Sequence, residues 1–143
     1  MPVQKVIPTE EVRQAEKEMK IRIMLVDDHE VVRNEVANLL LREPDFQIVG
    51  EASDGESAVS LVREIRPNVI LMDINMPRMN GIKVTRIIHN ESADIRIIGF
   101  SVSDEELQRK AITDAGAVGY FAKSGSSKDL IATIRPYSQE IPS

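Results

Sequence analysis

Residues 69–73 read Val69-Ile70-Leu71-Met72-Asp73, an unbroken apolar run that ends in a carboxylate. Two other short runs have the same form: residues 23–26 lead to Asp27 and Asp28, and residues 118–122 lead to Lys123. Near-continuous apolar runs are typical of strands covered on both faces, and the carboxyl ends of parallel strands line one edge of a sheet. We therefore predict that three carboxylates and one amine meet in a cleft. Repulsion between the anions favours a divalent cation with oxygen ligands there.

The apolar pattern alternates between two periods from residue 21 onward. It predicts strands near 21–26, 46–52, 69–73, 95–101 and 118–122. Apolar residues three and four apart predict helices between the strands. Asp54 could cap one helix, Pro67 closes that helix, Gly116 marks the end of another, and Pro136 cuts off a final helix at about 127–135. Strands alternating with helices predict an α/β fold built on a doubly wound parallel sheet of five strands.

The bulk composition sets limits on class. The chain has 143 residues, 42% of them hydrophobic, which suits a single domain with one core. Its net charge of −5 argues against a surface devoted to nucleic acid. It contains no cysteine, which excludes disulfides and thiolate metal sites. No apolar stretch approaches the ~20 residues of a membrane span, and we expect a cytoplasmic protein.

The two ends of the chain differ from its middle. We predict a charged extension at 1–19, a folded domain at 20–135 and a short tail at 136–143. Thr9 followed by two glutamates is typical of a helix start. Two interpretations of the extension stay open: a solvated or frayed segment, and a helix that packs on a partner.

Each candidate site residue also has an ordinary explanation. Asp27 and Asp28 could cap the following helix, Asp73 could be a turn residue, Ser101 could be another cap, and Lys123 could be solvated. The joint pattern is far more specific. It places an acid pair, an acid, a hydroxyl and a lysine at the ends of strands one, three, four and five, in that order.

This order resembles the receiver domains of response regulators in two-component signalling, over about residues 20–135. The strings Leu25-Val26-Asp27-Asp28-His29 and Leu71-Met72-Asp73-Ile74-Asn75-Met76-Pro77 carry the resemblance. Residues 28–29, 100–103 and 119–124 are similar to the LuxR/FixJ-like branch, whose members usually carry a DNA-binding helix-turn-helix after the receiver. The resemblance implies a flavodoxin-like fold with strand order 2-1-3-4-5 and five helices. It also implies a signalling domain that assists its own phosphorylation and dephosphorylation, and not an enzyme.

The resemblance implies specific roles for the acidic residues. Asp73 matches the phosphoacceptor, and a carboxylate can attack phosphorus to form an acyl phosphate. Mg²⁺ is the implied cofactor, with Asp28, Asp73 and the backbone carbonyl of Asn75 as ligands. Asp27 matches the residue that orients the water shell of the metal. Carboxylates and waters are the ligands that Mg²⁺ prefers.

The remaining residues match the switch of the family. Lys123 pairs with a phosphate oxygen, the Ser101 hydroxyl turns toward it, and Tyr120 changes rotamer in the space that Ser101 vacates. The surface at about 103–135, formed by the fourth helix, fifth strand and fifth helix, thereby changes. The implied phosphoryl donor is a sensor histidine kinase or phosphotransfer protein, and a homodimer is a further candidate assembly. We expect no direct nucleic-acid binding and no membrane contact by this chain.

The chain departs from the common family pattern at three positions. Ser101 stands where many receivers have threonine, and the bulk of Val102 stands where a smaller alanine is frequent. Ser124 follows the lysine where many receivers have a proline, which leaves the cis or trans state of the 123–124 bond open. We interpret His29 as a helix-start residue beside the cleft and His89 as a residue on a solvated helix face.

Three other functions compete with a free-standing switch. The chain could be the receiver part of a helix-turn-helix transcription regulator. An aspartate-nucleophile phosphatase would need its nucleophile after the first strand, in an Asp-x-Asp motif. A flavin-binding module would need glycine, serine and threonine in the loop where this chain has Asp27-Asp28-His29-Glu30.

Overall fold

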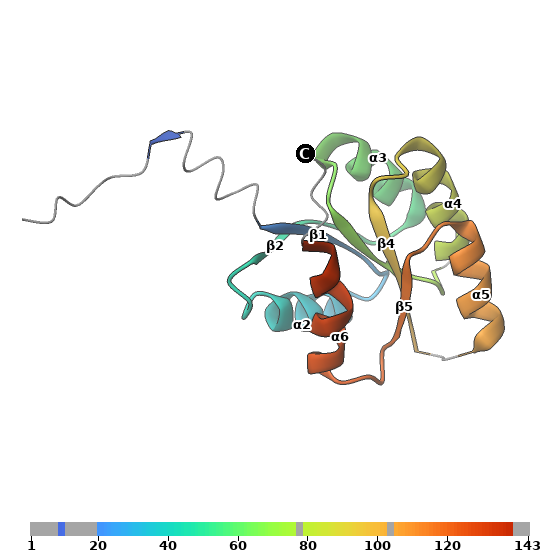
Figure 1. Cartoon of the computed structure of the whole chain (residues 1–143). Coiled ribbons are helices and arrows are strands. Elements are labelled where there is room, and N and C mark those ends of the chain that lie inside the picture. Colours follow the sequence, from blue (N-terminus) through green and yellow to red (C-terminus); the bar gives the residue numbers. More distant parts are fainter. Residues whose placement is uncertain (1–8, 11–19, 77–78, 103–104, 139–143) are drawn as a thin grey trace, which may run out of the picture.

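A parallel sheet of five strands forms the centre of the molecule (Figure 1), in a computed structural model that describes residues 9–10, 20–76, 79–102 and 105–138. The strand order is β2-β1-β3-β4-β5, as predicted. The strand bounds are β1 Ile21–Val26, β2 Phe46–Ala52, β3 Val69–Asp73, β4 Arg96–Ser101 and β5 Gly119–Ala122. Each predicted strand is therefore confirmed to within one residue at either end.

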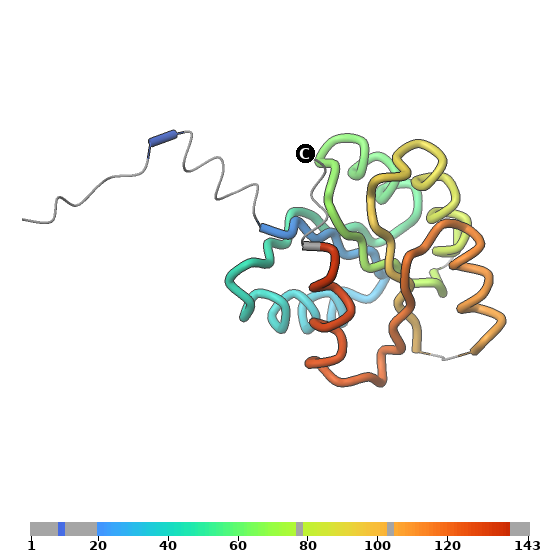
Figure 2. Tube along the Cα trace, viewed as in Figure 1, coloured from blue at the N-terminus to red at the C-terminus, as the bar shows by residue number. Residues whose placement is uncertain are grey.

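Helices cover both faces of the sheet, as the traces in Figures 1 and 2 show. Their bounds are α2 Glu30–Leu40, α3 Gly55–Ile65, α4 Gly81–Glu91, α5 Glu106–Ala115 and α6 Ser127–Ile134. Residues of α3, α4 and α5 join one buried apolar cluster, whereas those of α2 and α6 join the other. The doubly wound arrangement predicted from the sequence is confirmed.

Alternate residues of the inner strands belong to opposite cores, which explains why their sequences are apolar throughout. In β3, Ile70 and Met72 face the α3–α5 side, while Val69 and Leu71 face the α2–α6 side. All five residues of β3 are buried, Asp73 included. The apolar run therefore delivers the Asp73 carboxylate to the sheet edge from a fully enclosed strand.

Local capping fixes where several helices begin and end. The Asp54 side chain accepts a hydrogen bond from the Ser57 N–H at 2.8 Å, so the predicted cap of α3 is confirmed. Gly116 ends α5 with a φ of 124°, a conformation that favours glycine. A Cβ on Gly116 would collide with the His89 ring. The predicted solvated position of His89 is therefore wrong: the ring is half-buried against the end of α5.

The C-terminal part stays helical beyond the predicted stop. The α-helix ends at Ile134, but a 3-10 turn continues over Arg135–Ser138 and contains Pro136. Proline is tolerated near the start of a helical segment because its missing N–H is not needed there. The predicted helix in the N-terminal extension lies outside the described residues. None of the helices described has both the length and the apolar character needed to span a bilayer.

Candidate phosphoacceptor site

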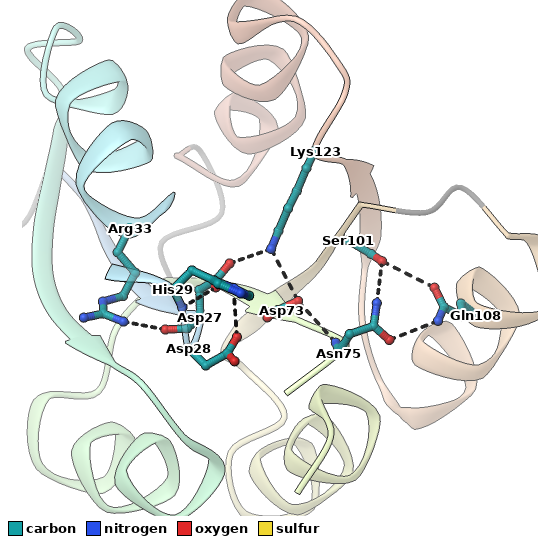
Figure 3. Close-up of polar contacts among 9 residues, drawn as sticks. All are labelled: Asp27, Asp28, His29, Arg33, Asp73, Asn75, Ser101, Gln108 and Lys123. Carbon is teal, nitrogen blue, oxygen red and sulfur yellow. Dashed lines mark hydrogen bonds and ion pairs between the residues drawn. The ribbon is translucent and has the colours of Figure 1, made fainter. Parts of the chain in front are cut away.

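The strand ends bring the predicted acidic residues together. Asp27 and Asp28 follow β1, and Asp73 ends β3 beside it (Figure 3). One ligand atom from each of Asp27, Asp28, His29 and Asp73 lies within 4.8 Å of the others. This spacing is close enough for one cation to contact several of them. The predicted convergence of the three carboxylates is therefore confirmed.

Lys123 supplies the positive charge of the site. Its Nζ donates to Asp27 Oδ2 at 2.7 Å and lies 3.5 Å from Asp73 Oδ1. The Lys123 side chain is 13% exposed, so water screens these charges little. Lys123 is joined to Ser124 by a trans peptide bond. Lys123 follows the carboxyl end of β5. Its amine therefore meets the carboxylates at the same edge of the parallel sheet, as predicted.

Asp73 sits in an environment that disfavours its charged form. Its side chain is 3% exposed, and burial together with the negative charge of Asp27 raises its pKa to about 6. The charge of Lys123 and the Asn75 N–H, which donates to Asp73 Oδ1 at 3.2 Å, partly offset this rise. The site therefore holds more negative charge than its own donors balance, which is the condition for binding a cation.

Asp28 offers an unsatisfied acceptor to such a cation. Its Oδ1 is buried and accepts no well-formed hydrogen bond from the described residues, although His29 Nδ1 lies 3.0 Å away. Buried acceptors are rarely left without partners. Three carboxylates, one of them with an oxygen that accepts no hydrogen bond within the described part of the chain, suit Mg²⁺ in their chemistry. The residues present therefore fit the metal that the family implies.

His29 and Arg33 hold the turn that carries the acid pair. His29 stands at the N-cap position of α2, as predicted, and its N–H donates to Asp27 Oδ1 at 2.9 Å. Arg33 donates from Nη1 to the Asp27 backbone oxygen at 2.6 Å and from Nε to Glu51 at 3.1 Å. The sequence did not predict a role for Arg33. Its spacing of one helical turn after His29 was the available signal.

Ser101 lies at the end of β4 and is fully buried. Its Oγ accepts a hydrogen bond from Asn75 Nδ2 at 3.1 Å and donates to Gln108 Oε1 at 3.4 Å. Gln108 Nε2 in turn donates to Asn75 Oδ1 at 3.2 Å. Neither Gln108 nor the side-chain contacts of Asn75 were predicted from the sequence. The contacts of Gln108 depend on the rotation of α5 about its axis, and a pattern of residue types does not predict that rotation.

The remaining predicted residue, Tyr120, lies on β5 with its ring half-buried against the α3–α5 core. The Arg109 guanidinium lies over this ring, 5.0 Å from its centre. Val102, which stands where a smaller alanine is frequent in the family, is 72% exposed. The structure thus joins Asp27 and Asp73 through Lys123 and places a ligand atom of Asp28 within 4.8 Å of both carboxylates. It places Ser101 and Tyr120 on the neighbouring strands β4 and β5.

Comparisons with known proteins agree with this arrangement. The family model described as the response regulator receiver domain matches residues 23–135. The transcriptional regulatory protein DegU of Brevibacillus brevis is 38% identical over 122 residues, which cover 85% of this chain and 52% of that protein. The nitrate/nitrite response regulator protein NarL of Escherichia coli K12 is 38% identical over 112 residues, covering 78% and 52%. The chain thus spans about half the length of these relatives.

Solved structures show the same fold. A two-component response regulator of the LuxR family from Aurantimonas sp. SI85-9A1 superposes with a TM-score of 0.80 at 35% identity, covering 83% of this chain and 85% of that one. The response regulator domain of Thermotoga maritima CheB gives a TM-score of 0.77 at 30% identity, covering 86% and 99%. The chain belongs to the response-regulator receiver domains of two-component signalling, on their LuxR/FixJ-like branch.

Proposed function

We propose that this chain is a phosphorylation switch whose phosphoacceptor is Asp73. The observation that carries the proposal is the position of the Asp73 carboxylate, which is buried at a strand end, 3.5 Å from the Lys123 amine and within 4.8 Å of the Asp28 ligand atom. A carboxylate nucleophile, a cation beside it and a set of oxygen ligands are the parts that phosphoryl transfer needs.

Three residues would hold Mg²⁺: Asp28 and Asp73 through their carboxylates and Asn75 through its backbone carbonyl. Asp27 would act through water, since Lys123 already occupies its Oδ2. A bound Mg²⁺ neutralises charge on the carboxylates and on the phosphoryl oxygens. The Oδ1 of Asp28, which is buried without a hydrogen bond from any residue that the structure describes, supports this assignment.

In the proposed transfer, a carboxylate oxygen of Asp73 attacks the phosphorus of a phosphohistidine on a sensor histidine kinase or phosphotransfer protein. The P–O bond forms as the P–N bond breaks, and the imidazole leaves and takes a proton. Lys123 then pairs with a phosphoryl oxygen as a point charge, and the Ser101 hydroxyl donates to another. The new group carries about −1.5 to −2 charge, enough to reorganise nearby donors.

The proposed output is a change in the surface that α5, β5 and α6 form. Tyr120 supports this idea because it lies on β5 while its ring contacts Arg109 of α5. Two relatives are named as transcriptional regulatory proteins, which favours control of transcription as the end result. We propose that this surface binds either a second copy of the chain or an effector. The effector would be a domain attached to the chain or a separate protein. Family membership supports the predicted cytoplasmic location.

We also propose residues 20–135 as the receiver, flanked by the extension at 1–19 and the tail at 136–143. The family match over 23–135 supports these limits. The 3-10 turn of Arg135–Ser138 crosses the C-terminal limit, and Arg135 is paired with Glu43 and Asp45. We therefore expect a truncation after Arg135 to lose part of this turn but to keep the switch.

The test is intact-protein mass spectrometry, which measures the mass of the chain after incubation with acetyl phosphate and Mg²⁺. The wild type should gain the mass of one phosphoryl group, and Asp73→Asn should gain none. Asp114→Asn is the matched control, because Asp114 is an exposed residue of α5. Labelling of the control should equal that of the wild type. A phosphoryl group that persists in Asp73→Asn would overturn the assignment of the phosphoacceptor.

A further inference from the structure

Three side chains beside the acidic site form a closed polar ring, which consists of Asn75, Ser101 and Gln108. Asn75 Nδ2 donates to Ser101 Oγ at 3.1 Å, Ser101 Oγ donates to Gln108 Oε1 at 3.4 Å, and Gln108 Nε2 donates to Asn75 Oδ1 at 3.2 Å. Figure 3 shows the three side chains turned toward one another. Each of them donates one hydrogen bond and accepts one within the ring.

The ring joins three separate elements of the fold. Asn75 follows β3, Ser101 ends β4, and Gln108 lies in the first turn of α5. The same loop residue that completes the ring also donates its backbone N–H to Asp73 Oδ1 at 3.2 Å. The polar ring is therefore connected to the phosphoacceptor on one side and to the start of α5 on the other.

A serine hydroxyl has a single proton to donate. In this structure Gln108 Oε1 lies 3.4 Å from Ser101 Oγ and accepts its hydrogen bond. In the proposed function the same proton has to reach a phosphoryl oxygen on Asp73. The Gln108 carbonyl and the phosphoryl group therefore compete for one donor, and Ser101 cannot satisfy both.

We propose that Gln108 is a positioning residue that holds the Ser101 hydroxyl in its unphosphorylated arrangement. This inference rests on the proposed function and adds a regulatory contact to it. Phosphorylation breaks the Ser101–Gln108 bond, which is the longest and hence the weakest of the three. Gln108 then loses its tie to β4, and the first turn of α5 becomes able to shift.

The position of Gln108 explains how the signal reaches the output surface. The next residue, Arg109, holds its guanidinium 5.0 Å from the centre of the Tyr120 ring. A shift of the first turn of α5 therefore moves the group that contacts Tyr120. A movement of α5 thus affects both the polar ring and Tyr120.

The experiment measures the affinity for beryllofluoride, a phosphoryl mimic, at saturating Mg²⁺ by isothermal titration calorimetry. Gln108→Leu removes both ring bonds of residue 108 and keeps a good helix former. It should bind beryllofluoride about threefold to fivefold more tightly, because one weak neutral hydrogen bond no longer has to break. Lys110→Leu is the matched control, as an exposed residue of the same helix, and should bind like the wild type.

A double-mutant cycle separates this role from a general effect on packing. In a Ser101→Ala background there is no proton to release, so Gln108→Leu should change the affinity less than twofold. A gain of the same size in both backgrounds, or an unchanged or weaker affinity of the single variant, would overturn the proposal. If Gln108→Leu fails to fold, Gln108→Met supplies the same comparison.

Binding of beryllofluoride by the wild type separates a failure of the proposed function from a failure of the role of Gln108. A wild type that takes up no beryllofluoride would refute the proposed function, and the inference with it. A wild type that binds, with Gln108→Leu binding equally, would refute the role of Gln108 alone.

Discussion

Replacing Asp73 by asparagine should stabilise the fold in the absence of divalent metal. Asparagine keeps the shape of the side chain but lacks its charge, and Asp73 is almost fully buried. Burial and the charge of Asp27 raise the pKa of Asp73 from 3.8 to about 6. Because a tenfold change in an ionisation constant is worth about 1.4 kcal/mol, the ionised carboxylate costs the folded state roughly 3 kcal/mol.

The sign of the pH dependence follows from linkage. Between pH 3.8 and about 6 the folded protein binds more protons at Asp73 than the unfolded chain does. The destabilisation is therefore complete above about pH 6 and disappears below the unfolded pKa. We expect Asp73→Asn to raise the free energy of unfolding at pH 7.5 by up to about 3 kcal/mol, and at pH 4 by less than about 1 kcal/mol.

The assay is urea unfolding followed by circular dichroism, with EDTA present, at both pH values. Asp114→Asn should stay within about 0.5 kcal/mol of the wild type, as exposed substitutions usually do. Addition of Mg²⁺ should reduce the advantage of Asp73→Asn, because the variant lacks one carboxylate ligand and gains less binding energy than the wild type. An Asp73→Asn variant that is no more stable than the wild type at pH 7.5, or whose advantage grows toward pH 4, would refute this reasoning.

Three further substitutions test other parts of the structure. Lys123→Met leaves the Asp27 carboxylate without its 2.7 Å partner; we expect lower stability without metal and slower labelling by acetyl phosphate, and labelling at the wild-type rate would contradict this. Arg33→Met removes the donor to the Asp27 backbone oxygen, and the Mg²⁺ affinity measured by calorimetry should fall by about tenfold, in the range of one charged hydrogen bond. Gly116→Ala should lower the free energy of unfolding by about 1–3 kcal/mol or more. The reason is that residue 116 has a φ of 124° and faces the His89 ring. A urea midpoint equal to that of the wild type would contradict this prediction.

The sheet and its acidic edge could be predicted because they depend on local patterns. The apolar runs predicted the strands. The positions of Asp73 and Lys123 at the sheet edge were predictable because each residue comes at the end of such a run. Parallel order then brought these ends together without knowledge of any side-chain rotamer. For the same reason the prediction of the cap at Asp54 needed only its own neighbours in sequence.

Contacts that depend on how a helix is rotated were not predictable. Gln108 meets Asn75 only because α5 turns that face toward the end of β4. Arg33 of α2 reaches Glu51 of β2, 18 residues later, through a contact that depends on which face α2 turns toward the sheet. The misplacement of His89 has the same origin, since its burial comes from the close approach of Gly116 at the end of another helix.

The most direct test of the central claim is a crystal structure of the protein with Mg²⁺ and beryllofluoride. We expect the beryllium atom bonded to a carboxylate oxygen of Asp73, a fluoride beside Lys123, and Mg²⁺ held by Asp28 and Asp73. Beryllofluoride attached to another residue, or a metal bound without Asp28 and Asp73, would contradict it.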